Sequence, residues 1–258
     1  MTAMSSARPA ATIMILRSHQ SQIEVLLLKR SRQVGFFPST WVFPGGRVDA
    51  ADAVVQYKGK ISGLDDPAFA VAGVRECFEE AGIWLGEGHP SATLRDALNA
   101  REATLLDAPE LIPNLSRLSW WSWWTTPTNE PKRYDTRFFL CCLSETEMAE
   151  ASPDNSELVQ SRWITPQDAL QLHQEGDFFL APPTLICLQE LCDFTDLTSL
   201  WEASERRQPT EIMPTHRKVN GRLEILFPNH PDHPEPKVCG LHRTGVLLDE
   251  QRRWQPLD

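Results

Sequence analysis

The sequence lacks several features that would place it in common classes of protein. Its apolar runs are far shorter than the ~20 residues that a transmembrane helix needs, and its six cysteines show no CxxC or Cys/His zinc spacing. It has no Gly-x-Ser-x-Gly elbow, no phosphate-binding P-loop, no internal repeat and no low-complexity tract. These absences predict a cytoplasmic protein with reduced thiols and no membrane partner.

Positive charge is also scarce. The chain carries 25 Lys and Arg against 35 Asp and Glu, a net charge of −10, which argues against a nucleic-acid partner. A nucleotide-like substrate would therefore need local cations or a metal ion to offset the like charges. The 258 residues are 41% hydrophobic and 23% charged, which is typical of a globular chain with a sizeable core.

The hydrophobic pattern predicts strands intermixed with helices, and hence an α/β or α+β fold. Residues 10–16 are interpreted as the first strand rather than as a signal peptide, because no basic region or cleavage signature accompanies them. With 24–29 they predict a hairpin. Further strands are predicted over 117–124, 134–143 and 159–164, and helices over 67–82, within 86–113, from Thr165 and over 184–194.

The C-terminal part has a different pattern. Residues 202–220 are charged and contain two prolines, so we interpret them as a linker. Residues 222–227 and 238–248 predict a small terminal β element, divided by a proline-rich loop. The chain is thus predicted to have one main domain over 8–195 and a linker with a C-terminal β extension over 196–258.

The predicted helix over 67–82 is the most informative segment. One stripe of it is apolar and formed by Val71, Val74, Phe78 and Ala81. The opposite face carries Glu76, Glu79 and Glu80. Neighbouring like charges repel by a few tenths of a kcal/mol per pair, whereas a hard divalent cation binds several carboxylates at once. The alternative is an acidic face that only contacts solvent.

Two neighbouring features favour a metal site over a solvated face. Arg75 has the spacing to pair with Glu79, and the turn Pro44-Gly45-Gly46 offers backbone carbonyls as further ligands. The segment Arg75-Glu-Cys-Phe-Glu-Glu-Ala-Gly-Ile83 resembles the second half of the Nudix box, R-E-U-x-E-E-x-G-U, at every fixed position. Phe43-Pro-Gly-Gly46 resembles the usual entry into that box.

The chain departs from the Nudix box in the middle. Gly46-x5-Asp52 is followed by 22 residues, where the consensus has seven, and Asp replaces the first Glu. The box is thus split into 46–52 and 75–83, and a plain loop position is one interpretation of Asp52. Such an interrupted box resembles the peroxisomal coenzyme A diphosphatases of mammals and their bacterial relatives. Leu26-Leu-Leu-Lys-Arg30 and Arg133-Tyr-Asp-Thr-Arg-Phe-Phe139 add to this resemblance.

The resemblance implies a Nudix fold, in which a mixed β-sheet lies between helices, and a metal-dependent pyrophosphohydrolase. It implies Glu76, Glu79, Glu80 and the Gly45 carbonyl as ligands of Mg²⁺ or Mn²⁺. Glu76 would serve as a ligand or a base, and Arg75 would orient the carboxylates. A second candidate base is Glu157, for which a solvated loop acid is an equally good interpretation.

Basic residues next to the predicted strands are candidates for binding the substrate phosphates. They are Lys29, Arg30 and Arg32 before the glycine turn and Lys132, Arg133 and Arg137 around a strand. We select Arg30, Arg133 and Arg137. The aromatic segment Trp120-Trp-Ser-Trp-Trp124 predicts a strand with one face buried and the other near a ligand or a subunit contact.

The predicted activity is the hydrolysis of coenzyme A or an acyl-coenzyme A to 3′,5′-ADP and (acyl-)phosphopantetheine. ADP-ribose, dinucleotides and nucleotide sugars are alternative substrates within the same class. A non-catalytic Nudix-fold ligand sensor is the alternative of another class, against which the intact glutamates speak. A homodimer is compatible with the pattern. The chain ends Gln-Pro-Leu-Asp258, without a Ser-Lys-Leu-like signal, so the cytoplasm is the predicted location.

Overall fold

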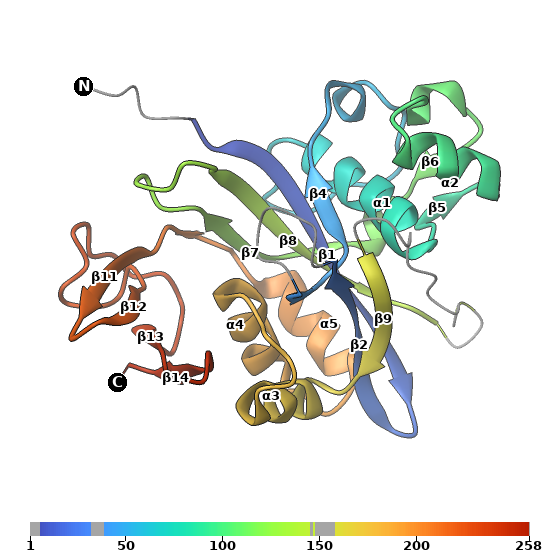
Figure 1. Cartoon of the computed structure of the whole chain (residues 1–258). Helices are drawn as coiled ribbons and strands as arrows, with labels where there is room; N and C mark the ends of the chain where they lie inside the picture. Colours follow the sequence, from blue (N-terminus) through green and yellow to red (C-terminus); the bar gives the residue numbers. More distant parts are fainter. Residues whose placement is uncertain (1–5, 32–38, 145–146, 148–157, 258) are drawn as a thin grey trace.

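The computed structural model describes residues 6–31, 39–144, 147 and 158–257. At its centre lies an antiparallel hairpin of β1 (Arg8–His19) and β2 (Gln22–Arg30) (Figure 1). Gln20 and Ser21 join the two strands with positive φ angles of 49° and 62°, the backbone conformation that fits the twist of a two-residue hairpin. The hairpin predicted from the sequence is confirmed.

The other strands of the main sheet extend on both sides of this hairpin. β8 (Tyr134–Cys142) runs parallel to β1, and β7 (Ser119–Thr125) runs antiparallel to β8. Two strands pair with β2: β3 (Trp41–Val42) and β9 (Leu158–Ile164). Two short strands extend the sheet elsewhere. β4 (Gly45–Arg47) pairs with β1, and β10 (Glu211–Ile212) pairs with β7. The sheet is therefore mixed, as predicted.

The two faces of the sheet are covered by different helices. α1 (Ala68–Ala81), with α2 (Ala92–Asn99) beside it, covers one face, where Ile13 and Ile15 of β1 are fully buried. Met14 and Leu16, which alternate with them, face the opposite side. That side is covered by α3 (Pro166–Glu175), α4 (Pro182–Leu191) and α5 (Leu197–Arg206). The predicted sandwich is confirmed.

Local signals explain where several of the helices begin and end. Thr165 accepts a hydrogen bond from the Asp168 amide at the start of α3, where Pro166 occupies the first helical position. α2 is much shorter than the region 86–113 in which a helix was predicted. The rest of that region forms β5 (Gly86–Glu87), η2 (Leu105–Asp107) and β6 (Ile112–Pro113), with η3 (Leu115–Arg117) just beyond it. None of the helices in the described part of the chain is long and apolar enough to cross a membrane.

The linker predicted over 202–220 is wrong. Its first residues complete α5, whose Leu200 is fully buried and which packs on β1, β7 and β8. Pro209 and Pro214 lie just outside β10 and mark its limits instead of keeping the segment irregular. The chain then forms a second sheet: β11 (Thr215–Val219), β12 (Arg222–Leu226), β13 (Gly245–Leu248) and β14 (Trp254–Pro256), in this order.

A buried histidine attaches this C-terminal sheet to the main domain. His173 of α3 donates through Nδ1 to the Phe178 carbonyl (2.8 Å) and accepts at Nε2 from the Trp254 amide of β14 (3.0 Å). The Trp254 indole donates to the Leu180 carbonyl at 2.9 Å. Burial lowers the pKa of His173. A proton on Nε2 would also remove the acceptor that the Trp254 amide requires.

We expect acid to weaken the attachment through His173. The unfolded chain takes up a proton near the ordinary histidine pKa of about 6.5, whereas the folded state takes it up only at lower pH. Between these values the unfolded state binds more protons, so this contribution to stability is present above pH ~6.5 and is lost as the pH falls. His173→Asn should reduce the slope of unfolding free energy against pH over this range, measured by urea denaturation. His89→Asn, at an exposed histidine, is the control and should leave the slope unchanged.

Candidate active site

α1 presents Glu76, Glu79 and Glu80 on one face because its opposite face packs in the hydrophobic core. Val71, Val74 and Phe78 are buried against the main sheet, whereas Glu79 and Glu80 are half-buried. The helix ends at Gly82, which has a left-handed φ of 73° and donates its amide to the Phe78 carbonyl at 2.9 Å. The predicted helix and its glycine stop are confirmed.

Arg75 organises this group. Its guanidinium binds both carboxylate oxygens of Asp52 at 2.9 Å and donates to the Arg47 carbonyl at 2.8 Å. Its remaining nitrogen, Nη1, lies 3.0 Å from a carboxylate oxygen of Glu76 and 3.0 Å from one of Glu79. The predicted Arg75–Glu79 pair is therefore present. Arg75 therefore positions two of the three carboxylates, those of Glu76 and Glu79.

Asp52 is more than a loop residue. It lies in the short helix η1 (Ala50–Ala53), and its side chain is only 1% exposed beside an Arg75 side chain that is 6% exposed. Asp52 also accepts a hydrogen bond from the Asp49 amide at 2.8 Å. The inserted residues connect η1 to α1, and η1 packs against that helix. The two halves of the split box thus meet in space.

Two of the three carboxylates have pKa values raised above the ordinary glutamate value. Burial raises the pKa of Glu76 to about 7; Arg75 opposes this shift and the neighbouring Glu79 adds to it. Burial also raises the pKa of Glu79. Glu80 accepts a hydrogen bond from the Gly45 amide at 2.7 Å. This surplus of hard oxygen donors in one helical turn fits a divalent cation.

The present hydrogen bonds determine how the glutamates are arranged. Glu76 and Glu79 share Arg75, and Glu80 turns to the Gly45 amide. Among the residues that the structure describes, no three acidic, histidine or cysteine side chains are already grouped as metal ligands are. A cation at this site would exchange some of these hydrogen bonds for its own contacts.

Gly46 is required next to Glu76 for reasons of space. A Cβ atom on Gly46 would lie 2.4 Å from the carboxyl carbon of Glu76. We expect Gly46→Ala to displace this carboxylate and to lower kcat by roughly 10²-fold, the effect of moving a catalytic group by about 1 Å. The fold should persist, because the displaced atoms are the end of a flexible side chain. Steady-state kinetics with a thermal melt checks both; an unchanged kcat would contradict the assigned position of Glu76.

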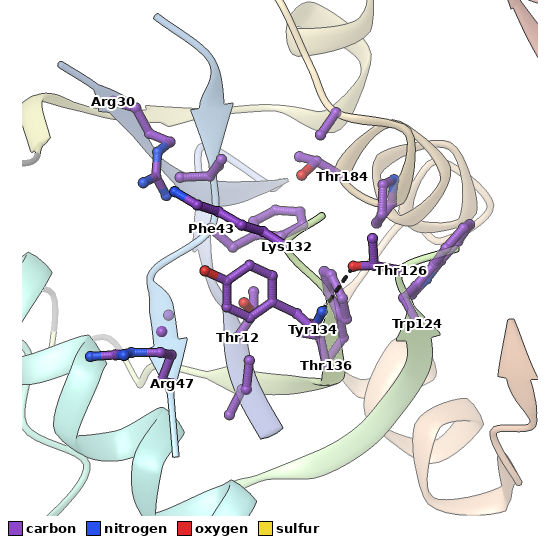
Figure 2. A pocket seen from close by; sticks show the side chains of 18 of the residues that line it. Thr12, Arg30, Phe43, Arg47, Trp124, Thr126, Lys132, Tyr134, Thr136 and Thr184 are labelled. Atoms are coloured by element: carbon purple, nitrogen blue, oxygen red, sulfur yellow. Dashed lines mark hydrogen bonds between the residues drawn. The ribbon is translucent and has the colours of Figure 1, made fainter. Parts of the chain in front are cut away.

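Glu76, Glu79 and Glu80 line a cleft of about 1320 Å³. Gly45, Gly46 and Arg47 of β4 form its wall beside α1. Figure 2 shows Arg30 and Lys132 reaching into the cleft with their nitrogen ends toward one another, close to Tyr134. Two cations that converge in this way favour an anionic group between them. The cleft can therefore hold a metal ion, phosphates and a longer ligand together.

The structure brings only part of the predicted substrate-binding set to this cleft. Arg30 lines it, but Arg133 and Arg137 do not. Arg133 donates to the carbonyls of Thr126 and Pro127 at 3.1 Å, so it holds the turn before β8. Glu157, the second candidate base, lies outside the described residues.

Arg137 lies on the opposite face of β8. Its guanidinium stacks over Trp123 (3.8 Å to the ring centre) and Phe69 (4.6 Å) and pairs with Asp135.

In β7 a bulge between Trp120 and Ser122 interrupts the alternation of side chains between the two faces of the sheet. Trp121 and Trp124 are consequently both buried in one core cluster, and Trp124 also lines the cleft.

Lys132, Arg47 and Tyr134 are cleft residues that the sequence-based selection missed. Tyr134, Thr136 and Phe138 alternate along β8 and all line the cleft, whereas Lys132 comes from the bend before the strand. The period of two residues in the strand was therefore a signal against Arg137, which lies between Thr136 and Phe138.

Comparison with known proteins agrees with this geometry. Residues 58–191 match the family described as the NUDT19 Nudix domain. The chain belongs to the Nudix hydrolase family. A crystal structure of a NUDIX hydrolase from Alicyclobacillus acidocaldarius is 31% identical and has a TM-score of 0.67, covering 78% of this chain and 97% of its own. The Nudix fold predicted from the split box is thus confirmed, and the chain is a pyrophosphohydrolase of this family.

Curated relatives of this Nudix hydrolase have a more specific name. The acyl-coenzyme A diphosphatase NUDT19 of Gallus gallus is 30% identical, over 88% of this chain and 78% of its own length. The Homo sapiens protein of the same name is 29% identical, over 68% of this chain and 62% of its own length. Nudix hydrolases generally need a divalent metal ion, which agrees with the donor set on α1.

Proposed function

We propose that this Nudix hydrolase cleaves the pyrophosphate of coenzyme A or of an acyl-coenzyme A. The products would be 3′,5′-ADP and (acyl-)phosphopantetheine. The observation that carries the proposal is the composition of this cleft, which joins carboxylates and converging cations to apolar side chains of β12 and β13. Coenzyme A has matching parts, because its anionic diphosphate is continued by an amide-containing arm and, when acylated, by an apolar chain. The similarity to proteins named acyl-coenzyme A diphosphatase supports the same substrate class.

The box residues would divide the chemical work. Glu79, Glu80 and the Gly45 carbonyl would hold Mg²⁺ or Mn²⁺, with Glu76 as a third ligand or as the base, and the bound cation would neutralise phosphate charge and activate water. Arg75 keeps Glu76 and Glu79 in place. Arg30 and Lys132 would bind phosphate oxygens. The P–O–P bond breaks as water adds to phosphorus, and the water gives up a proton to a base.

Glu76 is our candidate for that base among the described residues. Its pKa, raised to about 7 by burial, would let it accept a proton near neutral pH. Glu157 stays a second candidate base. Arg133 and Arg137 would act on the substrate only indirectly, through the turn and the strand that they support. The division into a main domain over 8–195 and an extension over 196–258 stays a prediction, although α5 and β10 of the main sandwich lie beyond its boundary. The cytoplasmic location and a homodimer stay predictions.

A substrate panel tests the proposal. Purified protein with Mg²⁺, and separately with Mn²⁺, is incubated with coenzyme A, an acyl-coenzyme A, ADP-ribose, NADH, a diadenosine polyphosphate and a nucleotide sugar. We expect metal-dependent release of 3′,5′-ADP from the coenzyme A samples. Cleavage of another panel member alone would retain the Nudix reaction and refute this substrate. The protein is a ligand sensor instead if the wild type binds a panel member without cleaving it and the Glu79→Gln variant binds the same ligand.

A further inference from the structure

The C-terminal sheet forms one wall of the catalytic cleft. Leu223 and Ile225 of β12 and Leu248 of β13 all line it, although they lie more than 140 residues after the box helix. Leu223 is directly opposite Leu248 in the register of the two strands, so their side chains share one face. In Figure 1 this sheet lies beside α4, on the far side of the main sheet from α2. We refer to Leu223, Ile225 and Leu248 as the aliphatic wall.

The aliphatic wall is neither fully buried nor simply exposed. Its three side chains pack against the adjacent core cluster and remain partly accessible from the cleft. In the same part of the cleft, α4 and the segment before it contribute Phe179, Pro182 and Pro183. Apolar side chains that stay accessible in a cleft gain stability only when a ligand covers them.

Within the described part of the chain, Trp124 adds an unpaired hydrogen-bond donor to the same core cluster. This side chain is 4% exposed and lines the cleft, and among the described residues nothing accepts a hydrogen bond from its indole nitrogen. An edge-on contact with Phe227 fixes the ring, with 5.6 Å between the ring centres. A buried donor without an acceptor is costly, and a ligand carbonyl that reached this nitrogen would remove that cost. The pantetheine arm has two amide carbonyls and an acyl thioester a third.

We propose that the aliphatic wall binds the acyl chain of the substrate, which makes the C-terminal sheet the chain-length determinant of the enzyme. This inference rests on the proposed function. Arg30 and Lys132 line the same cleft as the glutamates and this wall, so phosphates and acyl chain can be bound at once. The cleft volume of about 1320 Å³ exceeds the 300–1,000 Å³ of ordinary small-molecule pockets and suits a ligand of this length.

A chain-length series tests the wall. The substrates are free coenzyme A and its butanoyl, octanoyl and dodecanoyl thioesters, all below their micellar concentrations. We measure kcat/KM in wild type, and dissociation constants by calorimetry in the Glu79→Gln background with Mg²⁺. Both should improve with chain length, by up to about fourfold per methylene that becomes buried. Leu223→Ser should reduce the advantage of dodecanoyl over free coenzyme A by roughly tenfold.

Two further variants keep the test interpretable. Val219→Ser, also in the C-terminal sheet but 37% exposed and outside the cleft, should retain the wild-type chain-length profile. Leu223→Phe keeps the wall apolar but fills space, so it should shift the preference to shorter chains even if the serine variant folds poorly. Equal losses for free coenzyme A and for every thioester would overturn the inference, as would a flat profile in wild type.

The series also separates this inference from the proposed function. Hydrolysis of free coenzyme A without any effect of chain length would refute the aliphatic wall alone. Chain-length-dependent binding that Leu223→Ser abolishes, without hydrolysis of any member, would support the wall and refute the proposed function.

Discussion

Replacing Asp52 by alanine should lower the free energy of unfolding by about 3 kcal/mol, the cost of breaking a buried ion pair by removing one partner. Arg75 would lose both 2.9 Å contacts to this carboxylate while remaining buried. Since Arg75 also positions Glu76 and Glu79, kcat/KM should fall by about 10–100-fold, as it does when the support of a metal ligand is lost. Denaturant titration and steady-state kinetics measure the two effects.

Asp49 supplies a matched control for this prediction. Its carboxylate lies 3.8 Å from the same guanidinium, but its side chain is 53% exposed. An exposed ion pair contributes ~0–1 kcal/mol and an N-cap about 1 kcal/mol, so Asp49→Ala should cost clearly less stability than Asp52→Ala. If the two alanine variants lose the same stability and activity, the assignment of Asp52 as the buried partner of Arg75 is wrong.

Replacing Glu79 by glutamine should have the largest effect on activity. Cations in such sites contribute several kcal/mol to the transition state, so the loss of one charged ligand should lower kcat by about 10³-fold. Stability should stay the same or rise, because burial disfavours the charged form of Glu79 and glutamine can still accept the bond from Arg75. Kinetics at saturating Mg²⁺, with a thermal melt, checks this separation of effects.

The control for Glu79→Gln is a glutamate on the surface. Glu110 is exposed and lies outside the cleft, so Glu110→Gln removes the same charge without touching the site. Its kcat should equal that of wild type. A Glu79→Gln enzyme that retains full kcat would exclude this residue as a metal ligand.

The helical period and one short motif were enough to predict which carboxylates share one face of α1. Glu76, Glu79 and Glu80 share a face of α1 because residues three and four apart meet on a helix, and Arg75 pairs with Glu79 for the same reason. Asp52 could not be assigned in this way. Its contact with Arg75 depends on the path of the inserted residues, and no local periodicity describes that path.

Strand geometry would have improved the choice of cations. Arg137 has the opposite phase to Tyr134 and Thr136, which line the cleft, whereas Lys132 and Arg133 come just before the strand. The choice of the two arginines followed their position inside the family-like segment and ignored which face each side chain takes.

The C-terminal sheet could be predicted only in part. Its strands β12 and β13 have apolar side chains and were expected, but β14 is short and is placed by two distant partners, His173 and Leu180. The sequence does not predict that this sheet lines the cleft. Neither composition nor spacing relates Leu223 to the distant helix α1, and only tertiary packing brings them to the same cleft.

The most direct test of the central claim is ³¹P nuclear magnetic resonance of coenzyme A incubated with the enzyme and Mg²⁺ or Mn²⁺. The account predicts that the two coupled pyrophosphate resonances disappear, that two phosphomonoester resonances replace them and that the 3′-phosphate resonance persists. Glu79→Gln should leave the spectrum of coenzyme A nearly unchanged over the same time. Loss of the 3′-phosphate with an intact pyrophosphate, or an unchanged spectrum with wild-type enzyme, would contradict it.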